Sequence, residues 1–253
     1  MNPFSLEGRT ILITGASSGI GAQCAIDCSK MGAKVVLVAR NEERLNSVLS
    51  QCEGDFHAYY LADMAEIVDK GARVLLEQIV SEHGKLDGFI HSAGIQKTAP
   101  LKLLSMKDYQ EVIKVNTLSA FEILKYLPSI KYMNAGGHIV LVASITGVIG
   151  RSGLAAYSAS KGALISAVRS MSLELAQRDI CINCVSPGTI LTPLMQTYLD
   201  TLDDNKKKQR VDGFPLGLGQ TTDISYACIY LLSNASRWIT GQNLVIDGGY
   251  TAR

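Results

Sequence analysis

The chain has 253 residues, of which 47% are hydrophobic, and its formal net charge is +1. This length suffices for one large α/β domain with a well-buried core. The near-neutral charge gives no reason to expect nucleic acid or an anionic membrane as a partner. No apolar run reaches the ~18 residues of a membrane span, and the N-terminus lacks a basic region followed by an apolar one, so we expect a cytoplasmic protein.

Apolar, β-branched runs alternate along the chain with stretches of helical periodicity. We predict strands near residues 10–14, 34–39, 56–61, 87–90, 138–143, 180–185 and 243–246. We predict helices near residues 19–31, 41–51, 66–83, 106–132, 155–178 and 222–233. This alternation predicts a single domain over residues 1–253, an α/β fold with a doubly wound parallel sheet of about seven strands and helices on both faces.

The first predicted strand runs directly into a glycine-rich turn, Gly15-Ala16-Ser17-Ser18-Gly19-Ile20-Gly21. Glycines let the backbone approach a pyrophosphate, and the start of the following helix offers unpaired N–H groups and a positive dipole end. The spacing G-x-x-x-G-x-G differs from the usual G-x-G-x-x-G fingerprint. The segment could be only a tight turn, but its place between a strand and a helix favours a phosphate cradle.

The end of the second predicted strand, Ala39-Arg40-Asn41, bears on the choice of cofactor. A dinucleotide fold that prefers NAD usually has an acid at this point, where it binds the ribose hydroxyls. Here Ala39 takes that position, and Arg40 can hold a 2′-phosphate by charge-assisted hydrogen bonds. We therefore expect NADP(H). The alternative is that Arg40 only begins the surface of the next helix.

Tyr157 and Lys161 are four residues apart in a predicted helix, so they lie on one face and reach one pocket. A phenol has a pKa of about 10. One ammonium ~4 Å away can lower that pKa enough for proton transfer at neutral pH. Ser144 follows the preceding predicted strand. The three side chains together predict an acid/base site.

These segments resemble the short-chain dehydrogenase/reductases, in their compact single-domain branch, over nearly the whole chain. The matching positions are Thr14-Gly15-x-x-x-Gly19-x-Gly21, Asp63, Ala93-Gly94, Asn116, Ser144, Tyr157-x-x-x-Lys161, Pro187-Gly188-Thr189 and Asp247-Gly248-Gly249. The resemblance implies a Rossmann-like fold, a nicotinamide cofactor and carbonyl/alcohol redox chemistry. It also implies a catalytic set of four residues. In it Tyr157 donates a proton to the carbonyl oxygen, Ser144 positions that oxygen, Lys161 lowers the phenol pKa and holds the nicotinamide ribose, and Asn116 fixes a water.

The same resemblance implies the cofactor contacts. They are Gly15, Ser17, Ser18, Gly19, Ile20, Gly21, Arg40, Asn41, Asp63, Met64, Ser92, Ala93, Gly94, Tyr157, Lys161, Pro187, Gly188, Thr189, Ile190 and Thr192. Asp63 is expected to meet the adenine. The chain departs from the family at His91-Ser92, where the usual pattern is Asn-Asn. We expect His91 to form a hydrogen bond at a strand end rather than to act as a second base.

The stretch of about 187–219 is the least regular, and its length indicates a substrate loop. It holds a basic run, Lys206–Arg210, which could meet an anionic substrate, a phosphopantetheine arm or an acyl carrier, or could be a solvated helix face. An apolar substrate pocket is suggested by Ile145, Ile149, Leu154, Leu194 and Met195, with Gln96 and Arg151 adding polarity.

The substrate stays open between a beta-ketoacyl thioester, to which Arg178 points weakly because of its place in acyl-carrier-using members, and a sugar, polyol or hydroxysteroid. A non-catalytic dinucleotide-binding protein is a further alternative. We expect no metal, because Cys181 and Cys184 lie at an odd separation on a predicted strand and so face opposite sides. We also expect a homotetramer. The helices near 106–132 and 155–178 are apolar on more than one side, and the resemblance implies a second interface near the C-terminal Asp247-Gly248-Gly249.

Overall fold

The computed structural model describes residues 2–252, apart from the side chain of Leu194. Seven parallel strands form one sheet in the order β3-β2-β1-β4-β5-β6-β7. They are β1 (Thr10–Thr14), β2 (Lys34–Ala39), β3 (Ala58–Leu61), β4 (Leu86–His91), β5 (Met133–Val142), β6 (Cys181–Pro187) and β7 (Asn243–Ile246). Strand order reverses direction between β1 and β4, so the predicted Rossmann-like, doubly wound sheet is confirmed.

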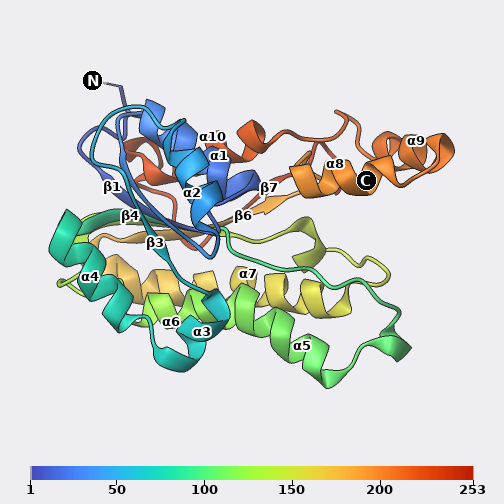
Figure 1. Ribbon diagram of the computed structural model, residues 1–253, viewed down its shortest axis with the longest axis horizontal. Helices are drawn as coiled ribbons and strands as arrows, with labels where there is room; N and C mark the ends of the chain where they lie inside the picture. The colour runs from blue at the N-terminus through green and yellow to red at the C-terminus, as the bar shows by residue number, and fades with distance from the viewer. Residues whose placement is uncertain (1, 253) are drawn as a thin grey trace.

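Helices cover both faces of this sheet (Figure 1). They are α1 (Gly19–Lys30), α2 (Glu42–Leu49), α3 (Met64–Lys70), α4 (Arg73–His83), α5 (Met106–Ile113), α6 (Ser119–Tyr126), α7 (Ala155–Leu175), α8 (Pro193–Asp200), α9 (Asp204–Asp212) and α10 (Thr221–Leu232). In Figure 1, α1, α2 and α10 lie on one side of the sheet and α4, α6 and α7 on the other, while α8 and α9 project beyond it. None of the described helices is both long and apolar enough to cross a membrane.

The alternation of side chains along each strand divides the core into two layers. In β1, Ile11 and Ile13 are buried with α1 and α10, while Leu12 between them is buried with α4, α6 and α7. Successive strand residues point to opposite faces, and a parallel sheet covered on both sides therefore needs apolar residues at every position. Cys24 and Cys28 of α1 are fully buried in the first layer.

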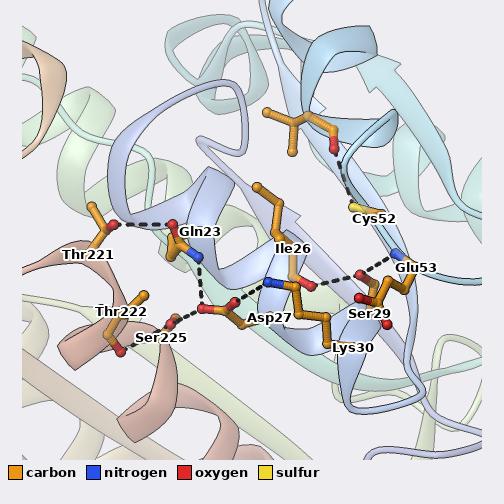
Figure 2. Close-up of polar contacts among 11 residues, drawn as sticks. Gln23, Ile26, Asp27, Ser29, Lys30, Cys52, Glu53, Thr221, Thr222 and Ser225 are labelled. Atoms are coloured by element: carbon orange, nitrogen blue, oxygen red, sulfur yellow. Dashed lines mark hydrogen bonds and ion pairs between the residues drawn. The ribbon is translucent and has the colours of Figure 1, made fainter.

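A buried carboxylate ties α1 to α10 on one face of the sheet (Figure 2). Asp27 of α1 accepts hydrogen bonds from Ser225 Oγ of α10 at 2.5 Å and from Gln23 Nε2 at 2.9 Å. Gln23 in turn accepts one from Thr221 Oγ1 at 3.2 Å. A buried charge is tolerated where such partners replace water. These bonds hold α1 in place, and the first turn of α1 lies at the end of β1.

Two long predicted helices are wrong in detail. The predicted helix over 66–83 is two helices, α3 and α4, because Gly71 leaves the helical conformation with φ +86°. The predicted helix over 106–132 contains a π-helical turn, Lys114–Leu118, between α5 and α6, and it ends at Tyr126. Pro128 follows two residues later, and it has no N–H with which to continue the helical hydrogen bonds. β5 consequently begins at Met133 rather than near 138.

The stretch of about 187–219 is more regular than predicted, because it contains α8 and α9, and its role as a substrate loop stays a prediction. Each begins at a side-chain cap: Thr192 Oγ1 accepts from Met195 N at 3.2 Å, and Asp203 Oδ1 accepts from Lys206 N at 2.9 Å. Pro193 occupies the first turn of α8. Such caps satisfy N–H groups that a helix start leaves open. The other predicted elements agree with the structure to within three residues at each end.

Candidate active site

The predicted site residues gather at one edge of the sheet. Gly15 follows β1, Arg40 follows β2, Ser92 follows β4, and Gly188 follows β6. Ser144 lies two residues after the end of β5. The carboxyl ends of parallel strands share one edge, and ligands of such sheets bind there, near the reversal of strand order.

Close backbone packing shapes the glycine-rich turn after β1. Gly15 has φ +68°, and a Cβ atom on it would lie 2.6 Å from the Ala93 backbone nitrogen. A Cβ on Gly21 would lie 2.4 Å from the Gly15 carbonyl oxygen. Ser18 forms no side-chain cap on α1, so the first N–H groups of that helix are left for a ligand. The turn therefore fits the pyrophosphate of a dinucleotide.

Segments distant in sequence meet around this turn. A Cβ on Gly19 would lie 3.2 Å from Thr192 Cγ2, so the start of α8 faces the cradle. After β6, Thr189 and Ile190 are buried, and Ile190 pairs with Gly219 in an isolated bridge. Of the predicted cofactor set, Thr192 thus lies against the turn, and Thr189 and Ile190 support the segment that faces it.

The end of β2 presents a cation rather than an acid. Ala39 is buried, and the Asn41 side chain caps α2 by accepting from Arg44 N at 2.8 Å. The Arg40 side chain is 70% exposed and its Nη1 lies 3.3 Å from Asp63 Oδ2. An exposed ion pair of this kind contributes about 0–1 kcal/mol, so it leaves Arg40 free to bind a stronger anion. Asp63 also caps α3 through Ala65 N at 2.8 Å.

Tyr157 and Lys161 share one face of α7, as predicted. Lys161 is buried, and its Nζ donates to the Val142 carbonyl oxygen at 2.7 Å and lies 5.8 Å from the centroid of the Tyr157 ring. Burial lowers the pKa of Lys161 to about 8. Val142, at the end of β5, is a partner that the residue pattern did not predict, because a backbone acceptor leaves no residue-type signal.

The pKa of Tyr157 differs from the sequence-based expectation. Burial raises it, and a hydrogen bond with Ser144 lowers it in part. The expected lowering by the Lys161 ammonium is absent here, and the Lys161 Nζ donates to the Val142 carbonyl instead of to the phenol. A phenol with a raised pKa is protonated at neutral pH, which is the form that donates a proton.

Ser144 is held by a neighbour that the residue pattern also did not predict. Its Oγ accepts hydrogen bonds from Thr146 N at 3.2 Å and from Thr146 Oγ1 at 3.0 Å. With both acceptor positions of the Ser144 oxygen taken, its own proton remains to be donated. The sequence signal for this contact is a hydroxyl residue two positions after Ser144, because Ser and Thr often form such local hydrogen bonds.

Asn116 lies in the π-helical turn and joins three segments. Its Oδ1 accepts from Ile95 N at 2.7 Å, and its Nδ2 donates to Ile95 O at 2.9 Å and to Ser160 Oγ at 3.0 Å. A Cβ on Gly94 would lie 3.3 Å from Asn116 Oδ1 and 3.4 Å from Lys161 Nζ, so these three residues converge. The side chain of Asn116 is therefore structural, and its role in fixing a water stays a prediction.

His91 forms the predicted hydrogen bond at a strand end. It is paired with Thr14 across β1 and β4, and its Nδ1 lies 2.9 Å from Thr14 Oγ1. Burial, and then the nearby Lys161, lower the pKa of His91 to about 3. The ring is thus neutral at physiological pH and a weak base.

A cavity of about 390 Å³ opens beside Ser144. Of the predicted apolar pocket, Ile145 and Ile149 line it, whereas Leu154 is buried in the protein and the side chain of Leu194 lies outside the described residues. The other lining residues are Thr146, Arg151, Tyr198, Leu202, Lys206, Gln209, Arg210, Gly213, Phe214 and Tyr250.

Arg178 and the cysteines have structural positions. Arg178 donates to the carbonyl of Pro128 and, at 2.9 Å, to that of Met133, so it fastens the start of β5 rather than facing solvent.

All six cysteines are free thiols, and Cys184 packs in the α7-side core while Cys181 does not. Within residues 2–252, no group of three or more His, Cys, Asp or Glu side chains is arranged to hold a metal ion.

Comparisons with known proteins agree with this geometry. A family model described as enoyl-(acyl carrier protein) reductase matches residues 15–251. The 3-oxoacyl-acyl-carrier-protein reductases FabG of Thermotoga maritima and Rickettsia prowazekii are 31% and 34% identical to the chain, over 96% and 97% of it and 98% of each relative. A solved structure from Agrobacterium tumefaciens, provisionally named a 2-deoxy-D-gluconate 3-dehydrogenase and holding NADP, has a TM-score of 0.86 and 29% identity over 100% of both chains.

The fold, the glycine turn and the Ser144–Tyr157–Lys161 arrangement define a nicotinamide-dependent oxidoreductase class. The chain belongs to the short-chain dehydrogenase/reductase family.

Proposed function

We propose that this protein is an NADP(H)-dependent enzyme that catalyses reversible hydride transfer between the nicotinamide and a carbonyl or secondary-alcohol carbon. The observation that carries the proposal is the placement of Tyr157, Lys161 and Ser144 at the same sheet edge as a cradle in which Gly15 and Gly21 admit no side chain. That arrangement puts a proton donor beside a dinucleotide site.

The cofactor, when bound, supplies the hydride. In the reduction direction Tyr157 donates its proton to the carbonyl oxygen, and general acid catalysis of this kind contributes about 10²- to 10⁴-fold. Ser144, oriented by Thr146, donates a second hydrogen bond to the same oxygen. Lys161, buried on the same face of α7 as Tyr157, would hold the nicotinamide ribose.

Preference for NADP(H) follows from Arg40. A guanidinium and no acid at the end of β2 attracts a 2′-phosphate, and the Agrobacterium tumefaciens relative was solved with NADP bound. A hydrogen bond to such a charged group contributes about 1.5–3 kcal/mol, or roughly 10- to 150-fold in affinity.

The test is a fluorescence titration of NADPH and NADH on the wild type, Arg40→Ala and Arg44→Ala. Arg40→Ala should weaken NADPH by about 10-fold or more and leave NADH unchanged. Arg44 is exposed on α2 and serves as the control for lost surface charge. Equal affinities of the wild type for NADPH and NADH would refute the preference.

One candidate substrate class is a beta-ketoacyl thioester, because the FabG relatives are named for that chemistry. The alternative is a sugar, polyol or hydroxysteroid, which the name of the Agrobacterium tumefaciens relative supports. Arg178 no longer points to acyl carriers, because its bonds to Pro128 and Met133 give it a structural role. A turnover screen of ketoacyl thioesters, keto-sugars and simple ketones with NADPH decides between them. Absence of turnover with all of them would favour a non-catalytic dinucleotide-binding protein.

We further propose a homotetramer. Leu173 of α7 is 77% exposed and Trp238, just before β7, is 90% exposed. Large apolar side chains in two such places favour two interfaces, one along α7 and one at the C-terminal edge of the sheet. Light scattering at micromolar concentration tests this, and a mass near the 27.2 kDa of one chain would contradict it.

A further inference from the structure

Part of the basic run Lys206–Arg210 faces the cavity beside the catalytic serine. Lys206 and Arg210 of α9 line the cavity, and Arg151, from the segment after Ser144, lines it as well. The cavity also borders Ile145 and Thr146, which directly follow Ser144. Three cations and no carboxylate residue therefore line a space that adjoins the segment directly after Ser144.

The cations of this cavity are poorly paired. The Nε of Arg210 is buried and has no hydrogen-bond partner among the described residues, while its guanidinium lies 5.5 Å from the centre of the Tyr198 ring. Arg151 forms no ion pair with a described carboxylate, whereas Lys206 is paired with Asp203 at 2.9 Å. A buried donor without a partner is costly, and a guanidinium matches the geometry of a bound anion.

The walls of the cavity limit the size of its occupant. Phe214 and Tyr250 stack on each other with ring centroids 4.5 Å apart. The volume of about 390 Å³ is at the small end of the ~300–1,000 Å³ usual for ligand pockets. The cations and the residues beside Ser144 share this one small space. An anion bound there lies close to the segment after Ser144, so it fits a group on the same compact molecule as the carbonyl better than a phosphate at the far end of a carrier arm.

We infer that the cavity binds a negatively charged group on the substrate itself, so that the enzyme acts on a small carbonyl compound carrying a carboxylate or a phosphate. This inference rests on the proposed function for the carbonyl chemistry. Arg210 is the main contact, with Arg151 and Lys206 adding to the positive potential. Lys208 belongs to the same basic run but does not line the cavity, so it is outside the proposed site.

The experiment compares pairs of carbonyl compounds in which one member carries an anionic group and the other does not. The carboxylate pair is levulinate and methyl levulinate, and the phosphate pair is dihydroxyacetone phosphate and dihydroxyacetone. For each compound kcat/KM is measured with the reduced cofactor, on the wild type, Arg210→Gln and Lys208→Gln. We expect one charged member to exceed its neutral partner by about 10-fold or more, Arg210→Gln to abolish this advantage, and Lys208→Gln to retain it.

A binding measurement separates this inference from the proposed function. Calorimetric titration of levulinate and dihydroxyacetone phosphate uses the enzyme saturated with the oxidised form of whichever nicotinamide cofactor binds, so that no reduction takes place. Binding that Arg210→Gln weakens about 10-fold, without any turnover, would support the anion site and refute the oxidoreductase proposal. Turnover with no preference for charge, or anion binding that is absent or unaffected by Arg210→Gln, would overturn the anion site and leave the proposed function standing.

Discussion

The two halves of the site are built in different ways. The cofactor half comprises the Gly15–Gly21 turn, Arg40, Asp63 and Ser92–Gly94, and close backbone contacts such as that between Gly15 and Ala93 shape it. The proposed substrate half comprises residues 145–151 and 193–219, where side chains on a projecting segment shape the cavity and Leu216 is 86% exposed. Tightly packed backbone admits few residue types, whereas exposed side chains admit many. The cofactor half therefore indicates the kind of chemistry, and the substrate half selects the molecule.

The largest expected difference between the halves concerns two tyrosines. Tyr157→Phe should lower kcat for carbonyl reduction about 10³-fold, because the ring stays and only the proton donor is lost. Tyr198→Phe keeps the ring beneath Arg210 and should change kcat by a few-fold at most. Steady-state kinetics with NADPH checks both, and cofactor titration should show unchanged affinity in both. Near-wild-type turnover in Tyr157→Phe would disprove the mechanism.

Two glycines with positive φ provide the next comparison. Gly15→Ala should destabilise the protein by about 3 kcal/mol, since a strained φ adds to an impossible contact with Ala93. Gly217 has φ +77° but no atom within 4 Å of a Cβ, so Gly217→Ala should cost only about 1 kcal/mol. Urea unfolding measures both. Equal destabilisation would show that backbone packing does not distinguish the halves.

A buried amide and an exposed one give a smaller contrast. Asn116→Ala leaves the Ile95 N–H without its acceptor, and we expect a loss of about 2–3 kcal/mol in the free energy of unfolding. Gln209→Ala, in the substrate half, removes an exposed side chain and should change that free energy by less than about 0.5 kcal/mol. The same unfolding assay applies. A loss below about 1 kcal/mol in Asn116→Ala would mean that water replaces the missing bonds.

The smallest predicted effect is a pH dependence due to His91. Its pKa is about 3 in the folded protein and ~6.5 when unfolded, so between these values only the unfolded state binds the proton. Stability from the neutral ring is full above pH ~6.5 and is lost as the pH falls, by about 2 kcal/mol at pH 5. His91→Asn should flatten the decline by that amount. The contribution of His138 to the pH dependence of stability is the same in the wild type and in His91→Asn, so it cancels in the comparison. Parallel pH profiles of stability for the wild type and His91→Asn would contradict the assignment of this pH dependence to His91.

Much of the fold could be predicted from the sequence because a buried position accepts only certain residue types. The strands are apolar runs, and the glycine turn after β1 needs glycines for contacts that a Cβ would forbid. The starts of α8 and α9 carry residue types typical of helix caps, Thr192-Pro193 and Asp203, so both helices could also be predicted from the sequence. The break at Gly71 was likewise visible in principle.

Other features of the site have no residue-type signal. The π-helical turn at Lys114–Leu118 continues a helical pattern, so nothing in its composition separates it from α5. The direction of Lys161 towards the Val142 carbonyl depends on how far α7 lies from the end of β5. The pairing of Arg210 with the cavity depends on how α9 packs. Such contacts form between two elements, so the sequence of either element alone does not predict them.

The π-helical turn makes the site sensitive to the number of residues as well as to their identity. It sits directly between α5 and α6, and Asn116 is its middle residue. Removing one residue there would restore regular α-helix and rotate α5 by about 100° relative to α6. Asn116 could then no longer reach Ile95 and Ser160 while α5 kept its contact with α7. A deletion that removes no functional side chain would thus disconnect the loop after β4 from α7, with the same loss of contacts that Asn116→Ala causes by removing the side chain itself.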